Sequence, residues 1–379
     1  MELYIMTNIP SILPKSFHIK PYDYHSQRVL VIAELGTSHG ADRLKAKELV
    51  DAAAEAGADC VKLQLVYADE ILHPNTGEVQ LPGGRLRLYD VFKRLELSLD
   101  FFVELKEYVE ARNLVFLCTP FGIKSAQELR SLGVKAMKLA SPELNHLSLV
   151  QELASYELPT LISSGVSRLA DIERALDYFS PEKTCLLHCV TAYPAPETEY
   201  NLRLLPSLSA LFGVSVGVSD HSLDAELVPS LSVCMGAVAI EKHFCLSRSD
   251  PGLDDSIALD PPDFIKMVRA IREVEKLGRE AALSAIEKER GARLVNTVLG
   301  DGVKRLAASE KANYTRTNRS IHVLRDIQQG EILQKEDIAS LRTEKNLRPG
   351  LEPLWEPLIP GRQAREFIAS GEGLRFTDI

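Results

Sequence analysis

The chain has 379 residues, of which 45% are hydrophobic and 26% are charged, which is typical of a globular protein with a large core and room for a second small domain. Acidic residues outnumber basic ones and give a net charge of −9, which argues against nucleic acid or an anionic membrane as a partner. An anionic substrate stays open, because lysines in a cleft override the overall charge locally.

Residues 1–28 are expected to form an N-terminal extension. They lack the basic start and apolar run of a secretory signal. The longest apolar run of the chain, at residues 233–240, is far shorter than the roughly 20 residues needed to span a bilayer. The six cysteines include no CxxC pair and lie mostly in apolar runs, as buried thiols do. These features predict a cytoplasmic protein.

Residues 29–278 alternate short apolar runs with helical segments, two of which are expected at residues 43–56 and 101–112. The predicted strands are VLVIAEL (from Val29), CVKLQL (Cys60), LVFLCT (Leu114), AMKLA (Ala136), PTLISSG (Pro159), CLLHCV (Cys185), VSVGVSD (Val214) and AVAIEKHF (Ala237). Eight such units predict an α/β fold, a (β/α)8 TIM barrel. An open doubly wound sheet is the alternative, although no GxGxxG follows the first strand.

The remaining segments are of a different character. Residues 66–99 form a long excursion after the second strand, on the expected catalytic face of a barrel. Residues 279–317 are charged and rich in alanine, and we expect a linker with some helix. Residues 318–379 are rich in turns and β-type residues and predict a small β-rich domain, in which DIQQGEIL forms a turn between two short strands.

Polar side chains stand at the end of nearly every predicted strand, where burial costs free energy unless they are paired or used. In a single strand such a residue is more often a structural partner, but the repetition predicts a ring of polar groups above a packed barrel. The ring comprises Glu34, Lys62, Gln64, Thr119, Lys138, Ser141, Ser163, Ser164, His188, Thr191, Ser219, Asp220, His221, Glu241 and His243.

Two lysines, Lys62 and Lys138, lie near hydroxyl groups and the Ser164–Gly165 turn. Ammonium groups with hydroxyls and backbone N–H groups suit a phosphate site. A Schiff-base lysine, as in barrel aldolases, is the competing interpretation. A structural ion pair is the third.

Two histidines, His221 and His243, end adjacent strands, which suits a divalent metal with coordination positions left open. Asp220 and Glu34 are candidates for additional oxygen ligands. Loops beyond the strand ends carry His73, Tyr193, Asp254 and Asp255, which we expect to surround the neutral, hydroxyl-rich part of a substrate.

Several motifs, in this order, resemble the sialic acid synthase family, which comprises N-acetylneuraminate synthases and their pseudaminic and legionaminic acid relatives. The motifs are IAELGTSH (32–39), AGADCVKLQ (56–64), TPF (119–121), MKLAS (137–141), SSG (163–165), HCVTAYP (188–194), GVSDHS (217–222), EKHF (241–244) and DPGLDD (250–255). The C-terminal NRSIHVLRDIQQGEIL resembles the antifreeze-like (SAF, β-clip) domain of that family.

The resemblance implies an enzyme that condenses phosphoenolpyruvate with an N-acetylated amino sugar, such as N-acetylmannosamine, to a nine-carbon 2-keto acid and phosphate, with Mn2+, Mg2+ or Co2+. By the same resemblance, Glu34, Lys62, Lys138, His221 and His243 are catalytic, and the two histidines hold the metal. The implied phosphoenolpyruvate ligands are Lys62, Gln64, Thr119, Lys138, Ser141, Ser163, Thr191 and Ser219. The implied sugar ligands are Glu34, Tyr193, Asp254 and Arg348, the last delivered across a domain-swapped homodimer.

The chain departs from the family pattern at a few positions. Ser38 stands where the first motif usually has Asn, SSGV replaces STGM, and Thr191 replaces a Ser or Asn. Together with the long 66–99 excursion, these changes leave the acceptor sugar open. Two other functions are weighed against the synthase, namely a class I aldolase and an inactive sugar-binding relative.

Overall fold

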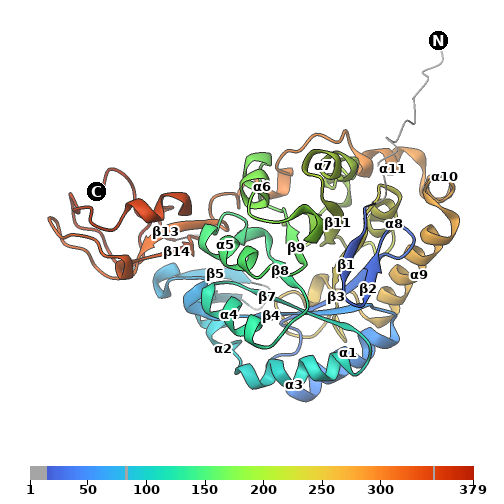
Figure 1. The fold of residues 1–379 in the computed structure, drawn as a ribbon, viewed down its shortest axis with the longest axis horizontal. Helices are drawn as coiled ribbons and strands as arrows, with labels where there is room; N and C mark the ends of the chain where they lie inside the picture. Colours follow the sequence, from blue (N-terminus) through green and yellow to red (C-terminus); the bar gives the residue numbers. More distant parts are fainter. Residues whose placement is uncertain (1–14, 82–83, 345) are drawn as a thin grey trace, which may run out of the picture.

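The computed structural model describes residues 15–81, 84–344 and 346–379, and its centre is a parallel barrel (Figure 1). The barrel strands are β3 (Leu30–Gly36), β4 (Cys60–Leu65), β7 (Val115–Pro120), β8 (Met137–Leu139), β9 (Thr160–Ser163), β10 (Thr184–Cys189), β11 (Ser215–Asp220) and β12 (Ala239–His243). They are ordered β7-β4-β3-β12-β11-β10-β9-β8, and β7 also lies against β8, which closes the ring. The TIM-barrel prediction is confirmed, and the open doubly wound sheet is wrong.

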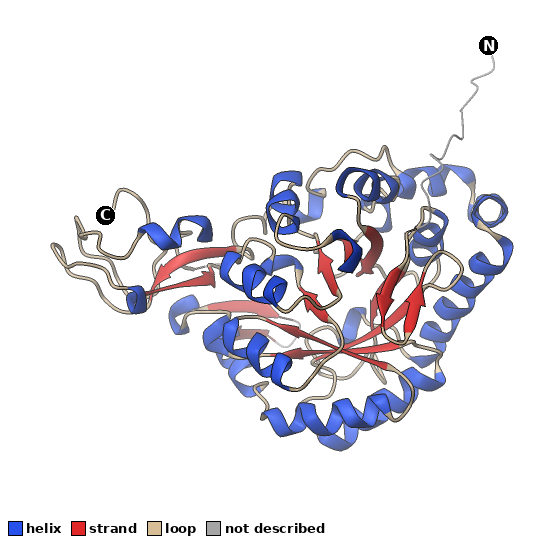
Figure 2. Cartoon of the chain, viewed as in Figure 1, coloured by secondary structure: helices blue, strands red, loops and turns tan. Residues whose placement is uncertain are grey.

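Helices surround this sheet on the outside (Figure 2). They are α1 (Arg43–Glu55), α3 (Leu99–Glu110), α4 (Ile123–Ser131), α5 (Leu147–Ser155), α6 (Leu169–Leu176), α7 (Leu204–Phe212), α8 (Leu227–Cys234) and α9 (Pro261–Leu277). The Asp42 side chain begins α1 by accepting the Leu44 N–H at 2.7 Å, and Asp260 caps α9, where Pro261 needs no N–H partner. No helix among the described segments is long and apolar enough to cross a bilayer.

The N-terminal end of the barrel is covered by a hairpin of β1 (Phe17–Ile19) and β2 (Tyr22–Tyr24). Phe17, Ile19 and Tyr24 are buried against inward-facing residues of the strands, in a cluster separate from the one under the outer helices. The described part of the expected extension therefore seals this end of the barrel, and an opening for ligands must lie at the other end.

The excursion after β4 lies on the carboxyl side of the strands. It consists of the short helices η1 (Ala68–Glu70) and η2 (Pro74–Thr76), the hairpin of β5 (Glu78–Leu81) and β6 (Gly84–Arg87), and α2 (Leu88–Arg94). The Glu70 carboxylate accepts the Lys124 N–H at 2.7 Å at the start of α4. The excursion is thereby fixed to the barrel.

The segment after the barrel is more helical than the linker expected from the sequence. It contains α10 (Arg279–Arg290), α11 (Ala292–Leu299) and the short helix η7 (Ala308–Glu310). Ala282, Val295 and Val298 are buried in the main core, so this segment is part of the barrel's packing.

The C-terminal residues form a small lobe beside the barrel, built on the antiparallel pair β13 (Arg319–Val323) and β14 (Ile338–Arg342) (Figure 1). Its other elements are the short helices η8 (Lys335–Asp337) and η9 (Pro353–Leu358). The predicted DIQQGEIL turn is present, with Gly330 at φ +85°. Its flanks pair with a distant segment through the Ile327–Ile368 and Ile332–Gln363 bridges, a partner that local pattern does not reveal.

A buried ion triad attaches this lobe to its own barrel. The carboxylate of Glu143, in the short helix η3 (Ser141–Glu143) after β8, lies 2.5 Å from Arg319 Nε and 2.8 Å from Arg342 Nη2. Arg319 is fully buried and also donates to the Phe121 carbonyl at 2.8 Å. Burial acts to raise the pKa of Glu143, but the two guanidinium groups hold it far below its usual value.

We expect Arg319→Leu to lower the free energy of unfolding by about 3–5 kcal/mol, because Glu143 would lose one of its buried partners. Urea unfolding measures this change, and limited proteolysis of the linker reports release of the lobe. Arg174→Leu is the matched control, since it breaks a partly exposed barrel–lobe pair with Glu352 at 3.1 Å and should cost less than about 1 kcal/mol. Equal losses in the two variants would contradict the proposed anchoring.

Candidate functional site

The carboxyl ends of the barrel strands bring the predicted polar ring together on the face opposite the hairpin. The register aligns Glu34 with Lys62 across β3 and β4, and His243 with Glu34 across β12 and β3. Parallel strands in this register place all these side chains at one mouth. All the predicted site residues of the barrel strands and of the loops that follow them lie here, apart from the exceptions given below.

Lys62 is the centre of the buried charges. Its Nζ lies 2.9 Å from Glu34 Oε2 and 3.6 Å from Glu241 Oε1, and it donates to Thr119 Oγ1 at 3.4 Å. Gln64 Nε2 donates to the other oxygen of Glu34 at 2.6 Å. Burial acts to lower the pKa of Lys62, but the carboxylates of Glu241 and Glu34 raise it above its usual value. Lys62 is therefore cationic at neutral pH.

Glu241 belongs to the polar ring predicted from the sequence, which did not indicate a role for it. Its carboxylate accepts from Ser219 Oγ at 2.9 Å, and its Oε2 is buried without a partner among the described residues. Burial acts to raise the pKa of Glu241, whereas Lys62 and Lys138 lower it. Its place on the same strand face as His243 is the signal that could have identified it.

Lys138 is the second ammonium group of the mouth, and it is poorly compensated. Its Nζ donates to Ser163 Oγ at 2.7 Å and to the Leu139 carbonyl at 3.0 Å. Burial lowers the pKa of Lys138 to about 8, and repulsion from Lys62 adds to this effect while Glu241 opposes it. The group is thus held by neutral oxygens and lacks a close carboxylate among the residues described, which suits it to bind an incoming anion.

Beside Lys138, the backbone of Gly165 lies between the hydroxyl groups of Ser141 and Thr191. We call these three residues the Gly165 cradle. The Gly165 N–H donates to Ser141 Oγ at 2.9 Å. A Cβ at Gly165 would lie 2.0 Å from Thr191 Oγ1 and 2.9 Å from Ser141 Oγ, so no larger residue fits between the two hydroxyls. This close approach of backbone and hydroxyl groups is typical of anion sites.

The two predicted metal ligands lie side by side. The ring centroids of His221 and His243 are 5.4 Å apart, and Tyr193 stacks on His221 at 4.3 Å. Nδ1 of His221 lies 3.0 Å from the Val190 carbonyl, and Nδ1 of His243 lies 3.9 Å from Asp254 Oδ2. In its neutral form His221 would donate from Nδ1 to this carbonyl and keep the Nε2 lone pair for a metal.

The oxygen ligands proposed from the sequence do not join these histidines. Asp220 is buried in an ion pair with Lys242 at 2.6 Å, on the other face of its strand, so its prediction as a ligand is wrong. Glu34 is engaged by Lys62 and Gln64. Within the described segments, no group of three or more His, Cys, Asp or Glu side chains could hold an ion. The donors present fit a divalent cation held by two imidazoles, with water and substrate at its remaining positions.

The loops at the rim define the neutral side of the mouth. A Cβ added to Gly36 would lie 3.7 Å from each of Asp254 Oδ2, Gln64 Nε2 and Glu34 Oε1, so these groups converge. Ser38 does not face this space, because its hydroxyl donates to the buried Asp255. Ser38, which replaces the usual Asn, therefore contacts the loop that carries Asp254.

Two residues expected near a substrate contact the lobe in this structure. His73 Nε2 is 3.3 Å from Ser370 Oγ, in the contact between excursion and lobe, and its role toward a substrate stays a prediction. Arg348 donates to the Gly373 carbonyl at 2.8 Å and to Asp378, both within the lobe. The single chain does not bring Arg348 to its own barrel mouth.

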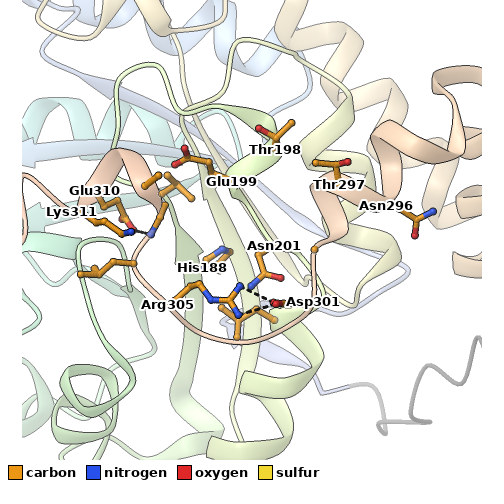
Figure 3. Close-up of a pocket in the computed structure, with 16 residues that line it drawn as sticks. His188, Thr198, Glu199, Asn201, Asn296, Thr297, Asp301, Arg305, Glu310 and Lys311 are labelled. Carbon is orange, nitrogen blue, oxygen red and sulfur yellow. Dashed lines mark hydrogen bonds and ion pairs between the residues drawn. The ribbon is translucent and has the colours of Figure 1, made fainter.

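A separate cavity of about 520 Å3 lies behind the mouth, between β10, α11 and residues 300–311 (Figure 3). Its wall includes His188, whose Nε2 donates to the Tyr200 carbonyl at 2.6 Å; burial lowers the pKa of His188 to about 3, so the ring is neutral. Val190 and Glu310 line the side of this cavity that faces the mouth.

Two family models match the chain. The NeuB family model matches residues 49–282, and the SAF domain model matches residues 318–379.

Individual relatives are similar over nearly the whole chain. The N,N'-diacetyllegionaminic acid synthase of Legionella pneumophila is 34% identical over 335 residues, which cover 86% of this chain and 88% of the relative. The pseudaminic acid synthase of Helicobacter pylori is 32% identical, with 92% and 97% covered. The solved structure of the spore coat polysaccharide biosynthesis protein spsE of Bacillus subtilis is 31% identical, with 96% and 99% covered and a TM-score of 0.79.

We expect the affinity of the mouth for inorganic phosphate to fall as the pH rises through about 8. The protonated form of Lys138 binds the anion, and the low pKa means that the free site loses this proton at unusually low pH. Calorimetric titration should show roughly 25-fold weaker binding at about pH 9.5 than at about pH 7.5. Lys138→Arg, which stays charged over this range, should flatten the profile; an equally steep profile in that variant would contradict the assignment.

Proposed function

The chain belongs to the NeuB family, and from this premise we propose that it condenses phosphoenolpyruvate with an N-acylated amino sugar to a nine-carbon 2-keto acid and inorganic phosphate. Its relatives are nonulosonic acid synthases, so the chain is a carbon–carbon bond-forming transferase, and condensation of phosphoenolpyruvate with an amino sugar is the family-level reaction. The observation that carries the proposal for this chain is the pair of lysines among hydroxyl groups at the mouth, opposite two histidines.

We assign phosphoenolpyruvate to the lysine side of the mouth. Lys62 and Lys138 would hold its phosphate and carboxylate, since each offers a buried ammonium group to an anion. Gln64 and the hydroxyl groups would complete the contacts; these are Thr119, Ser141, Ser163, Thr191 and Ser219. Holding both anionic groups fixes the enol between them, and this orientation is a large part of the rate enhancement in bimolecular reactions.

A divalent cation, Mn2+ or alternatively Mg2+ or Co2+, would be held by His221 and His243. Such an ion supplies Lewis-acid polarisation of the acceptor's aldehyde oxygen when bound. The protein's own contribution is to orient the two imidazoles through the Val190 carbonyl and Asp254.

The bond changes follow from this placement. Carbon 3 of the enol attacks the aldehyde carbon, and positive charge develops at carbon 2. Glu34, paired with Lys62 and Gln64, would lie beside this position, accept a proton from the water that adds to carbon 2 and return a proton to the former aldehyde oxygen, which becomes a hydroxyl group. The tetrahedral intermediate would then break its carbon 2–oxygen bond to phosphate as the carbon 2 hydroxyl becomes the ketone, and the leaving phosphate, bound to Lys138 and the hydroxyl groups, would take up that hydroxyl proton.

The acceptor sugar would lie toward Tyr193 and Asp254. The names of the relatives favour a 2,4-diacetamido trideoxy hexose, the kind of acceptor that would give a legionaminic or pseudaminic acid. N-acetylmannosamine and a cytidylylated or phosphorylated variant are the other candidates. Arg348 is held within the lobe and does not reach its own mouth, which supports a domain-swapped homodimer in which it meets the N-acyl group in a second copy of the chain.

The first test is release of phosphate from phosphoenolpyruvate with Mn2+ present, for each candidate N-acyl sugar and for a control without sugar. We expect release that requires one sugar and matches the 2-keto acid formed in equal amounts. Borohydride treatment with pyruvate should leave the lysines unmodified. Sugar-independent trapping of Lys138 would instead favour the aldolase.

We expect His243→Ala to lower turnover by more than about a hundredfold, because loss of residues that merely orient metal ligands already costs about 10–100-fold. The variant should keep the unfolding midpoint of the metal-free wild type and lose bound metal, measured by elemental analysis. His25→Ala is the control, since His25 lies by the hairpin at the opposite end of the barrel. Wild-type turnover in His243→Ala would exclude this residue as a ligand.

A further inference from the structure

A buried carboxylate from the segment between barrel and lobe stands behind the Gly165 cradle. Glu310 is 1% exposed, and its Oε1 accepts the N–H groups of Val166 at 2.7 Å and of Thr191 at 2.8 Å. Its Oε2 accepts the Ala307 N–H at 3.1 Å. One oxygen atom thus joins the turn after β9 to the turn after β10.

This segment and the first residue of the lobe hold the turn after β9 at two further points. Lys304 Nζ donates to the Ser164 carbonyl at 3.2 Å, and Asn318 Nδ2 donates to the Val166 carbonyl at 3.1 Å. Val166 has φ +42°, a left-handed conformation that is unfavourable for a β-branched residue. Such a conformation persists only where surrounding contacts enforce it.

These contacts bear directly on the spacing of the cradle. Gly165 lies between the hydroxyl groups of Ser141 and Thr191 with no room for a methyl group, so a small separation of the two turns would open the cradle. Without Glu310, two buried N–H groups would lose their acceptor, which is a large cost for each. The cavity behind Glu310 leaves space into which the released turns could move (Figure 3).

We propose that Glu310 is a positioning residue that fixes the phosphate end of the substrate site by joining the turns after β9 and β10. The inference rests on the proposed function, since it assigns phosphoenolpyruvate to the Gly165 cradle. A carboxylate repels phosphate, so Glu310 does not bind the substrate, and it acts through the backbone of Val166 and Thr191. Lys304, on the same segment, places a compensating positive charge beside the turn.

The test compares Glu310→Ala and Glu310→Gln with Lys311→Ala, a control at the next residue. Gln keeps an oxygen that can accept from both turns, and Ala removes it. We expect Glu310→Ala to raise the KM for phosphoenolpyruvate at least about tenfold while the KM for the sugar changes less than about twofold. Glu310→Gln and Lys311→Ala should stay within about threefold of the wild type.

Amide hydrogen exchange of the ligand-free protein supplies a second readout that needs no substrate. Glu310→Ala should expose the Val166 and Thr191 amides to faster exchange while the barrel strands stay protected. An unchanged KM for phosphoenolpyruvate, an equal rise in both KM values, or unchanged exchange would each overturn the inference. Wild-type protein that fails to use phosphoenolpyruvate, with exchange altered as expected, would instead locate the failure in the proposed function.

Discussion

The mouth of the barrel depends on the burial of two ammonium groups together with two carboxylates. The buried charge of Lys62 is stabilised because its Nζ lies 2.9 Å from Glu34 and 3.6 Å from Glu241. Removal of either carboxylate would leave two buried ammonium groups with a single carboxylate, and so an uncompensated buried charge. Lys138 is buried with both carboxylates, Glu241 and Glu34, at a greater distance, and burial together with repulsion from Lys62 lowers its pKa. The strand register that pairs Glu34 with Lys62 is therefore as much an electrostatic requirement as a consequence of packing.

Most of the barrel could be predicted because the features that define each strand lie close together in the sequence. Each strand is an apolar run of the right length, and a polar group at the carboxyl end of every run indicates a shared mouth. The roles of Glu310, Arg319 and Glu143 could not be predicted, because their partners are separated by long stretches of chain. Asp220 was misplaced because its position in the strand does not reveal its neighbour Lys242, with which it forms a buried pair on the opposite face.

The part of the chain between barrel and lobe is the clearest difference between sequence and structure. Its charged, alanine-rich composition suggests a tether, yet α10 and α11 pack on the barrel, and Glu310 reaches the backbone behind the mouth. Further along the chain, Asn318 begins the lobe and still contacts Val166. Lobe and mouth are thus mechanically connected through one short segment, in addition to the Glu143 triad.

The hairpin at the N-terminal end of the barrel determines from which side ligands can reach the barrel interior. Phe17, Ile19 and Tyr24 fill the far end of the barrel with apolar side chains, so the described residues leave the mouth as the route by which ligands reach the barrel interior. On the proposed reaction, both substrates would enter and both products would leave through this opening. Lys62 and Lys138 are almost fully buried whereas Tyr193 is half exposed, so a ligand beside the two lysines would have to bind before a sugar near Tyr193 covers it.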